Sequence, residues 1–573
     1  MTVALVLAAQ ADAGLRGQLA ALGVRQVDAA DRGGPGLLTV VAAAQAAGER
    51  VLICVGDDAL PEEILARLLE AGRTAAFIGM PARDGQAGHG AAALLVDEPD
   101  LDALAEAAES LVADDPAGTP ETPLNLGELI GELTSIGVSV RVLDAGPDGD
   151  GAVAHAIGEP AARDFALWAA ARQLSPASLY GMSLGLGLLS AVWFSEPAAR
   201  AQVLGIVLLL ASFTIGRAGA QLAAIGRDGR IRLAADWLGA ASGMLTEFAV
   251  YAALAISAGL AAGPGHPSGL NGIFGAALRG TMPAGLAGAG QKGMWRLAVA
   301  AMLLLGVRRL AEICYEGLAR ASGKIPVRPT RGMLGQVITL PAGERIAVIA
   351  VTAVFFGPRL TFVVLLAWGA VATAYLLAGQ LAEAARMTRV GGELAAYRGD
   401  GAVAYRLGAI VRGQLPPLPP LLVGLMVTCA LTVLGMANLT GILVLTPVAA
   451  MWLAGLGARH PHDGQADWLV PPLLLAGEGI FLAGLGFSRH VWLPVIFALL
   501  AGVVTRHADI AFRARSGRPV PDDAFGLGWD GRMLLVGLAA VAGLVPFACA
   551  VLAAWLWLLA GWDFLGAWLK TTN

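Results

Sequence analysis

The sequence predicts an N-terminal α/β domain with a parallel sheet, followed by a polytopic all-α membrane bundle of about twelve helices. Three observations predict this class. The 573 residues are 56% hydrophobic and 14% charged, whereas soluble proteins carry about 25% charged residues. Residues 1–165 hold 26 acidic and 9 basic residues, and residues 166–573 hold 18 acidic and 30 basic residues. Apolar runs long enough to cross a bilayer begin only after Ser175.

The first 115 residues alternate short apolar runs with helical patterns. The apolar runs 3–7, 51–55, 75–79 and 91–96 are typical of buried strands in a parallel sheet. We therefore assign 1–115 to a cytoplasmic α/β domain and 116–170 to a linker with an amphipathic lead-in. Neither part of the chain has the dense basic face of a nucleic-acid-binding protein, so nucleic acid is not an expected partner.

Twelve apolar segments after residue 175 are predicted to be membrane helices, because a bilayer core of about 30 Å needs roughly 20 apolar residues. They are 176–194, 199–223, 237–261, 296–312, 345–357, 359–380, 419–436, 438–456, 469–487, 490–505, 532–549 and 551–568. Arginines concentrate after the even-numbered helices, which predicts cytoplasmic termini and a multi-pass protein of the cell (inner) membrane. We divide this region into a six-helix domain (171–383), a cytoplasmic linker (384–418) and a C-terminal six-helix domain (419–573).

The second and third predicted helices carry the most informative pattern, which resembles the signature of the CDP-alcohol phosphatidyltransferases. That signature is D-x-x-D-G-x-x-A-R, then a spacer, then G-x-x-x-D-x-x-x-D. Its four aspartate positions fall here on Gly216, Gly219, Gly239 and Gly243. The flanking residues are similar, among them Gln221-Leu222-Ala223, Trp237-Leu238 and Glu247. The chain looks like an uncharacterised branch of that family in which a nucleotidyltransferase-like domain precedes the six helices.

The resemblance implies that the chemistry has been lost. In the family, four carboxylates hold divalent metal, which neutralises the CDP diphosphate and activates the attacking alcohol. Glycine has no side-chain ligand atom, so we assign no catalytic residue and no metal to these positions. Mg²⁺ or Mn²⁺ would bind only if Asp236 and Glu247 rescue a site. The competing interpretation is that the glycines simply let membrane helices pack closely.

Basic and polar residues around the signature are candidate ligands for a phosphate group. They are Arg217, Gln221, Arg230, Arg232 and Arg345. Arginine forks match phosphate oxygens, so an anionic lipid headgroup or a CDP-linked lipid is an expected ligand. The competing interpretation is that these arginines serve only membrane topology.

The N-terminal domain resembles sugar-phosphate nucleotidyltransferases, which place a glycine-rich loop and a lysine after the first strand. Here Gln10–Arg16 follows the strand with a single glycine, and no lysine comes after it. Asp57-Asp58 matches the place of a metal-binding aspartate, with a plain turn as the competing interpretation. The resemblance therefore implies a catalytically silent domain.

Two further features remain open. Glu478 lies in the middle of a predicted membrane helix, where an acid is functional by default, although its glycine neighbours also suit close packing. His460 and His462 could bind metal, and we expect a solvated loop instead.

Together these patterns predict a catalytically degenerate pseudoenzyme with a binding or scaffolding role in phospholipid or glycolipid synthesis. The lipid bilayer, an active homologue or a second copy in a homodimer are the expected partners. The alternatives are an active CDP-alcohol phosphotransferase with rearranged metal ligands and a secondary transporter.

Overall fold

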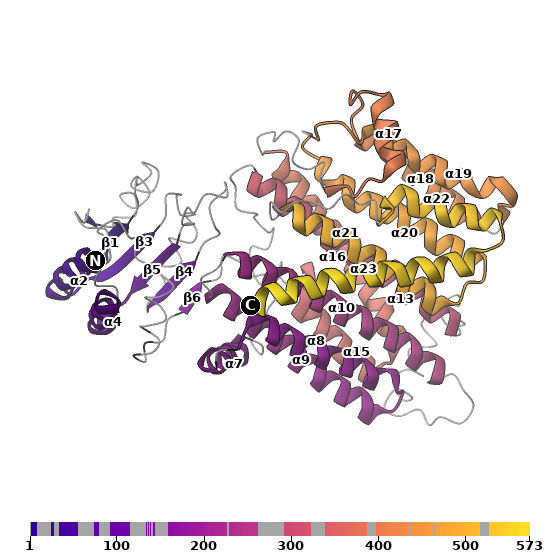
Figure 1. The fold of residues 1–573 in the computed structure, drawn as a ribbon. Coiled ribbons are helices and arrows are strands. Elements are labelled where there is room, and N and C mark those ends of the chain that lie inside the picture. The colour runs from indigo at the N-terminus through magenta and orange to yellow at the C-terminus, as the bar shows by residue number, and fades with distance from the viewer. Residues whose placement is uncertain are drawn as a thin grey trace. The chain divides into compact units, whose positions relative to one another are not determined.

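The chain forms two compact units, of which the first is built mainly by residues 1–147 and the second by 148–223 and 230–573 (Figure 1). The computed structural model describes residues 2–7, 25–27, 34–55, 74–78, 92–114, 133, 136, 138, 141–143, 159–172, 174–225, 229–261, 291–321, 338–386, 397–435, 438–462, 464–515 and 526–572. The Gln10–Arg16 loop and the Asp57-Asp58 pair, both examined in the sequence, lie outside these residues.

In the part of the first unit that the structure describes, a six-stranded sheet packs with two helices. Its strands are β1 (Thr2–Leu7), β2 (Arg25–Val27), β3 (Arg50–Val55), β4 (Ala75–Ile78), β5 (Ala92–Val96) and β6 (Arg141–Leu143). Its helices are α2 (Gly34–Ala47) and α4 (Leu101–Asp114). The four predicted apolar runs all form strands. The sheet also takes in β6, which lies within the segment predicted to be a linker.

The strand order is β2-β1-β3-β5-β4-β6, and the sheet is mixed. β1 pairs in parallel with β2 and β3, and β4 pairs in parallel with β6. β5, however, runs antiparallel to both β3 and β4. The prediction of a parallel sheet is therefore wrong, because alternating strands and helices suggest crossovers without recording the direction of each strand.

The core of the first unit follows the two-residue period of a strand. Val51 and Ile53 of β3 pack with Leu94 and Val96 of β5 beneath α2 and α4. The intervening Leu52 is also buried. Burial on both faces explains why the strand is a continuous apolar run rather than an alternating one.

The second unit is helical, and among the residues that the structure describes eight segments are long and apolar enough to cross a membrane. These segments are Pro176–Ser195, Ala199–Ala223, Ala235–Leu260, Pro358–Ala384, Leu418–Gly435, Asp467–Ser488, Leu493–Arg515 and Val545–Gly566. They belong to helices α8 (Pro176–Ser195), α9 (Ala199–Ile225), α10 (Gly229–Ala261), α16 (Pro358–Ala384), α18 (Leu418–Gly435), α20 (Val470–Ser488), α21 (Leu493–Arg515) and α23 (Val545–Thr572). The protein is therefore a multi-pass membrane protein in contact with the lipid bilayer.

The other four predicted membrane segments are helical but are not among these eight. α13 (Gln291–Ala321) is long but carries several charges, including Arg308 and Glu312. α15 (Ala342–Phe355) and α22 (Gly528–Val541) each have 14 residues. The segment Gly441–Gly457 is a short apolar run made of η5 (Gly441–Leu445), α19 (Thr446–Trp452) and η6 (Leu453–Gly457). The prediction of about twelve helices thus locates the elements but overstates how many of them have the length and composition of a span.

Local sequence explains several helix ends. Ser175 caps α8 by accepting a hydrogen bond from the Ser178 amide at 3.2 Å, and Pro176 occupies the first turn, where no amide hydrogen is needed. Between α15 and α16, Gly357 adopts φ 88°, which L side chains rarely adopt. The boundary between the predicted segments 345–357 and 359–380 is thus confirmed.

Helices from both predicted six-helix domains belong to the same compact unit and contact one another. α13 contacts α16 on one side and α20 and α21 on the other. Small residues allow these helices to approach closely: Gly306 of α13 faces Val504 of α21, and Gly479 of α20 faces Leu303 of α13. Two shorter helices, α7 (Glu159–Ala171) and α17 (Ala402–Ile410), also belong to this unit.

Candidate functional site

The transferase-like glycines surround the side chain of Tyr180 on α8. A Cβ atom built on Gly239 of α10 would lie 2.7 Å from Cε1 and 2.8 Å from Cζ of Tyr180. A Cβ atom built on Gly219 of α9 would lie 3.1 Å from the same Cε1 atom. The Tyr180 side chain is buried. Its ring therefore occupies the space between two positions at which the resemblance would place metal-binding carboxylates.

The other two signature positions differ from this pair. A Cβ atom on Gly216 would meet Oγ of Ser183, also on α8, at 3.0 Å. The Ser183 hydroxyl donates to the carbonyl of Ser212 on α9 at 2.7 Å. A Cβ atom on Gly243 would meet nothing within 4 Å. At three of the four positions, the absence of a Cβ atom lets a side chain of α8 pack against the glycine, which supports close helix packing. At two of these positions that side chain is Tyr180.

The two carboxylates considered as substitute metal ligands are far apart. Asp236 and Glu247 lie on α10, and a separation of 11 residues corresponds to about 16 Å along the helix axis. Two carboxylates on one helix at that distance cannot share an ion. Asp236 is exposed, and Glu247 is already paired with Arg345, with Nη2–Oε1 and Nε–Oε2 distances of 2.6 and 3.0 Å. The rescue of a metal site by these two residues is therefore not supported.

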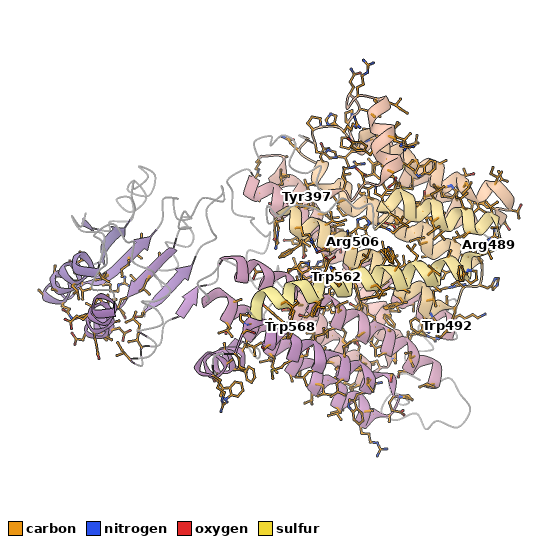
Figure 2. The ribbon with its side chains drawn as sticks, in the orientation of Figure 1. Tyr397, Arg489, Trp492, Arg506, Trp562 and Trp568 are labelled. Atoms are coloured by element: carbon orange, nitrogen blue, oxygen red, sulfur yellow. The ribbon has the colours of Figure 1, made fainter. Side chains whose placement is uncertain are left out.

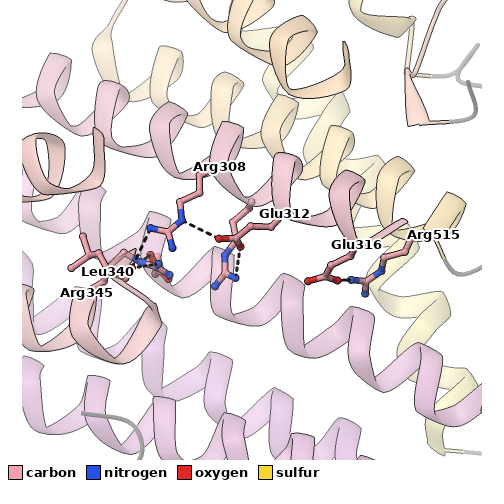
Figure 3. A network of polar contacts seen from close by, with 8 residues as sticks. Arg308, Glu312, Glu316, Leu340, Arg345 and Arg515 are labelled. Carbon is pink, nitrogen blue, oxygen red and sulfur yellow. Dashed lines mark hydrogen bonds and ion pairs between the residues drawn. The ribbon is translucent and has the colours of Figure 1, made fainter. Parts of the chain in front are cut away.

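A buried charge network connects α10, α13 and α15. Figure 3 shows Arg308, Glu312, Leu340 and Arg345 of this network. Besides Glu247, Arg345 donates from Nη1 to the Leu340 carbonyl at 3.1 Å. Arg308 donates to the same carbonyl at 3.3 Å and to Glu312 at 3.0 Å. Leu340 has φ 46°, an uncommon conformation for a residue with a side chain. Two guanidinium groups thus hold the turn that leads into α15.

The candidate phosphate ligands are not all brought together. Arg345 contacts Glu247, which is 17 residues beyond Arg230 on α10 and so about 25 Å farther along the axis. Arg230 and Arg232 lie in the first turns of α10, and their side chains lie outside the described part. Arg217 and Gln221 are half-buried on α9, with the Arg217 guanidinium 5.9 Å from the Phe213 ring centroid. The inclusion of Arg345 in a site with Arg230 is not supported.

Glu478 is fully buried and paired within the membrane helices. Arg532 of α22 donates to Oε1 at 2.6 Å from Nε and to Oε2 at 2.9 Å from Nη2. Nε2 of His507 on α21 lies 2.8 Å from Oε2. Sequence reasoning singled out Glu478 but did not identify its partners. A buried membrane acid needs an opposite charge, but residues 166–573 hold 30 basic residues, so the sequence does not show which of them pairs with Glu478.

A second charge cluster links α21 and α23, and we call it the quartet: Arg506, Asp509, Arg513 and Asp563. Arg506 lies 3.3 Å from both aspartates. Arg513 lies 2.9 Å from Asp509 and 2.7 Å from Asp563. The indole of Trp237 on α10 donates to Asp509 at 2.9 Å. The sequence analysis named Trp237 only as a residue flanking the signature, because nothing in a linear pattern pairs residues 272 positions apart.

The expected solvated histidine loop is wrong for His462. Its side chain is buried, and its Nε2 atom lies 3.3 Å from Nη1 of Arg398. Arg398 also donates to the Ala454 carbonyl at 2.9 Å. In the described ranges, no three His, Cys, Asp or Glu side chains are grouped as a metal site requires.

Comparison with known proteins yields one family. Residues 388–571 match a family of unknown function, DUF5941. This match covers the C-terminal helices and begins within the predicted linker 384–418. No curated protein sequence matches the chain.

Proposed function

We propose that this membrane protein is a catalytically degenerate relative of the CDP-alcohol phosphatidyltransferases, with a binding or scaffolding role in phospholipid or glycolipid synthesis. The observation that supports this proposal is the Tyr180 ring seated between Gly219 and Gly239. In an active member, carboxylates would project from these positions toward a shared metal. In this chain even a single added carbon at Gly239 would overlap the ring.

The chemistry of the remaining residues agrees with a non-catalytic role. Divalent metals such as Mg²⁺ take oxygen ligands from carboxylates. Both carboxylate oxygens of Glu247 already accept hydrogen bonds from Arg345. The residues present thus do not fit the metal that the family uses, and we derive no reaction step through it. An orientation in the inner membrane with the N-terminal domain in the cytoplasm follows from the arginine distribution and belongs to the same proposal.

A protein in this role would either assemble with a partner enzyme that catalyses the reaction or bind a ligand without converting it. An active homologue, a second copy of the chain or an anionic or CDP-linked lipid would meet this need. Arg217 is the described basic residue nearest to the glycine positions in sequence, and arginine suits phosphate oxygens. Replacing it with glutamine should weaken retention of an anionic lipid without altering membrane insertion.

Release of CMP tests the proposal. The purified full chain in detergent is incubated with CDP-diacylglycerol, an alcohol acceptor and Mg²⁺ or Mn²⁺, beside an active transferase as the positive control. We expect no metal-dependent CMP release. Release that disappears in the Asp236→Asn or Glu247→Gln variant would instead establish the rearranged-ligand enzyme.

The Glu478–His507–Arg532 triad favours transport as a second candidate function, since buried ionisable groups in membrane helices often form ion pathways. Proton flux into liposomes containing the protein, followed with a pH-sensitive dye under an imposed potassium gradient, tests it. Flux that the Glu478→Gln variant abolishes would support transport, and equal flux in protein-free liposomes would exclude proton movement.

A further inference from the structure

A cavity of about 230 Å³ lies between α8, α10, α21 and α23. Most of its lining is apolar, including Leu184, Leu245, Leu556 and Phe564. Its rim on α23 includes Gly561, which is exposed and whose missing Cβ would meet nothing within 4 Å. The cavity is thus a narrow apolar slot that opens along an exposed stretch of a membrane-spanning helix. We call it the α10–α23 slot.

One end of the slot is charged. Arg506, Asp509 and Asp563 line it, and Arg513 pairs with Asp563 at 2.7 Å. The side chains of Arg513 and Asp563 are 24% and 21% exposed, whereas Arg506 and Asp509 are nearly buried. The two partly exposed members of the quartet are therefore the base Arg513 and the acid Asp563.

The slot is distinct from the transferase-like glycines. Trp237, Ala241 and Leu245 line it and recur every four residues on α10, so they share one helix face. Gly239 and Gly243 lie two residues from these positions, which at 100° per residue places them on the opposite face. The slot and the transferase-like glycines are therefore separate features of the helical unit.

The depth of the quartet matters for what the slot can hold. Trp492, 72% exposed, immediately precedes α21 and marks one membrane interface. Figure 2 places it with Arg489 at one end of the bundle and Trp568 toward the other. Arg506 follows Trp492 by 14 residues, about 21 Å along the helix, within a hydrocarbon core of about 30 Å. A charge at the depth of Arg506 is costly and is expected to have a function. Arg513 follows Trp492 by 21 residues, about 32 Å along the helix, which places it at the opposite interface, where lipid headgroups lie.

We propose that the α10–α23 slot binds one acyl chain of a bilayer phospholipid with a phosphoethanolamine headgroup, which the quartet recognises. The cavity is smaller than the roughly 300–1,000 Å³ of a pocket that encloses a whole small molecule. A bound molecule must therefore extend beyond the slot, as a phospholipid does when its second acyl chain stays in the bilayer. A headgroup with both charges suits the exposed base and acid better than a purely anionic one. A primary ammonium can donate hydrogen bonds to Asp563, which a quaternary choline cannot.

The test compares lipid retention by matched variants. The full chain is reconstituted into bilayers of equal parts phosphatidylethanolamine, phosphatidylglycerol and phosphatidylcholine, re-extracted, and its bound lipid quantified by mass spectrometry. Gly561→Leu fills the slot, whereas Gly566→Leu, also with nothing within 4 Å, lies on the same helix outside the lining. We expect phosphatidylethanolamine to be enriched on the wild type and on Gly566→Leu. Gly561→Leu should lower it about tenfold, equivalent to about 1.4 kcal/mol.

Asp563→Asn tests headgroup recognition separately. It changes the formal charge of the quartet from zero to plus one, so retention should move from phosphatidylethanolamine to phosphatidylglycerol. Monodisperse elution of each variant shows that it is folded. Equal retention by the two leucine variants would overturn the slot. Retention without headgroup preference, unchanged by Asp563→Asn, would overturn the recognition of phosphoethanolamine.

Discussion

Replacing Gly239 with alanine tests the contact on which the proposed function depends. The new methyl group would lie 2.7 Å from Cε1 and 2.8 Å from Cζ of Tyr180, well inside van der Waals contact. On the other side of the ring, Gly219 has no Cβ, and the position one would occupy lies 3.1 Å from Cε1. The nearby α9 backbone therefore limits how far the ring can shift. Tyr180 also packs within a buried cluster that includes Trp237 and Phe512. The strain must therefore be taken up by the helices.

The magnitude follows from two opposing effects. Overpacking a well-packed interior costs about 1–3 kcal/mol, whereas alanine is favoured over glycine in a helix by about 1 kcal/mol. Gly243→Ala gains the second effect alone, because nothing lies within 4 Å of its Cβ position. Gly239→Ala should thus be about 1–3 kcal/mol less stable than Gly243→Ala. Thermal unfolding of the two variants in the same detergent measures the difference.

A double-mutant cycle identifies Tyr180 as the cause. Tyr180→Leu on its own removes a buried ring and destabilises the protein. Combined with Gly239→Ala, it should remove most of the alanine penalty, because the clashing atoms are gone. Equal unfolding temperatures for Gly239→Ala and Gly243→Ala would refute the packing argument, as would an alanine penalty that persists without the ring.

Two further predictions concern buried charges. Glu247→Gln leaves the Arg345 guanidinium without its ion pair and should cost about 3–5 kcal/mol in thermal unfolding, whereas the Glu247→Gln/Arg345→Met double variant should recover part of that loss. A double variant no more stable than Glu247→Gln would show that the pair is not the cause. Burial and the neighbouring Arg398 lower the pKa of His462 to about 4, below about 6.5 in the unfolded chain. The folded state binds fewer protons, so this contribution to stability is complete above about pH 6.5 and is lost as the pH falls toward 4. Unfolding temperatures between these limits should fall less steeply in His462→Gln than in the wild type, and parallel profiles would contradict the assignment.

Hydrophobic patterning predicted where the elements lie but not how they pair. Val51 to Val55 was identifiable as a buried strand because every residue is apolar. The antiparallel direction of β5 was not, since strand direction depends on how the connecting segments cross the sheet. In the helical region, the length and charge of each run located the helices. α13 carries several charges, and α15 and α22 have only 14 residues each. These three helices therefore lack the length or the composition of a simple membrane span.

The candidate site shows the same limit. The spacing of Gly216, Gly219, Gly239 and Gly243 pointed to two helices that pack against a third. It could not identify Tyr180, which lies 36 residues before the first glycine and contacts two of them only after folding. Likewise, Arg345 and Arg230 were predicted to be ligands of one phosphate group, but Arg345 of α15 pairs with Glu247, about 25 Å from Arg230 along α10. The spacing of a motif does not show which turn of α10 a residue on another helix contacts.

The central claim is that the Tyr180 ring fills a former metal site. The most direct test is Mn²⁺ titration of two variants in which the signature aspartates are restored. Both carry aspartate at positions 216, 219, 239 and 243, and one also carries Tyr180→Ala. Metal bound to each purified full chain is measured by calorimetry, with the wild type as the baseline and monodisperse elution as the folding control. We predict Mn²⁺ binding only when the ring is also removed. Equal Mn²⁺ binding by both variants, or by neither, would contradict the account.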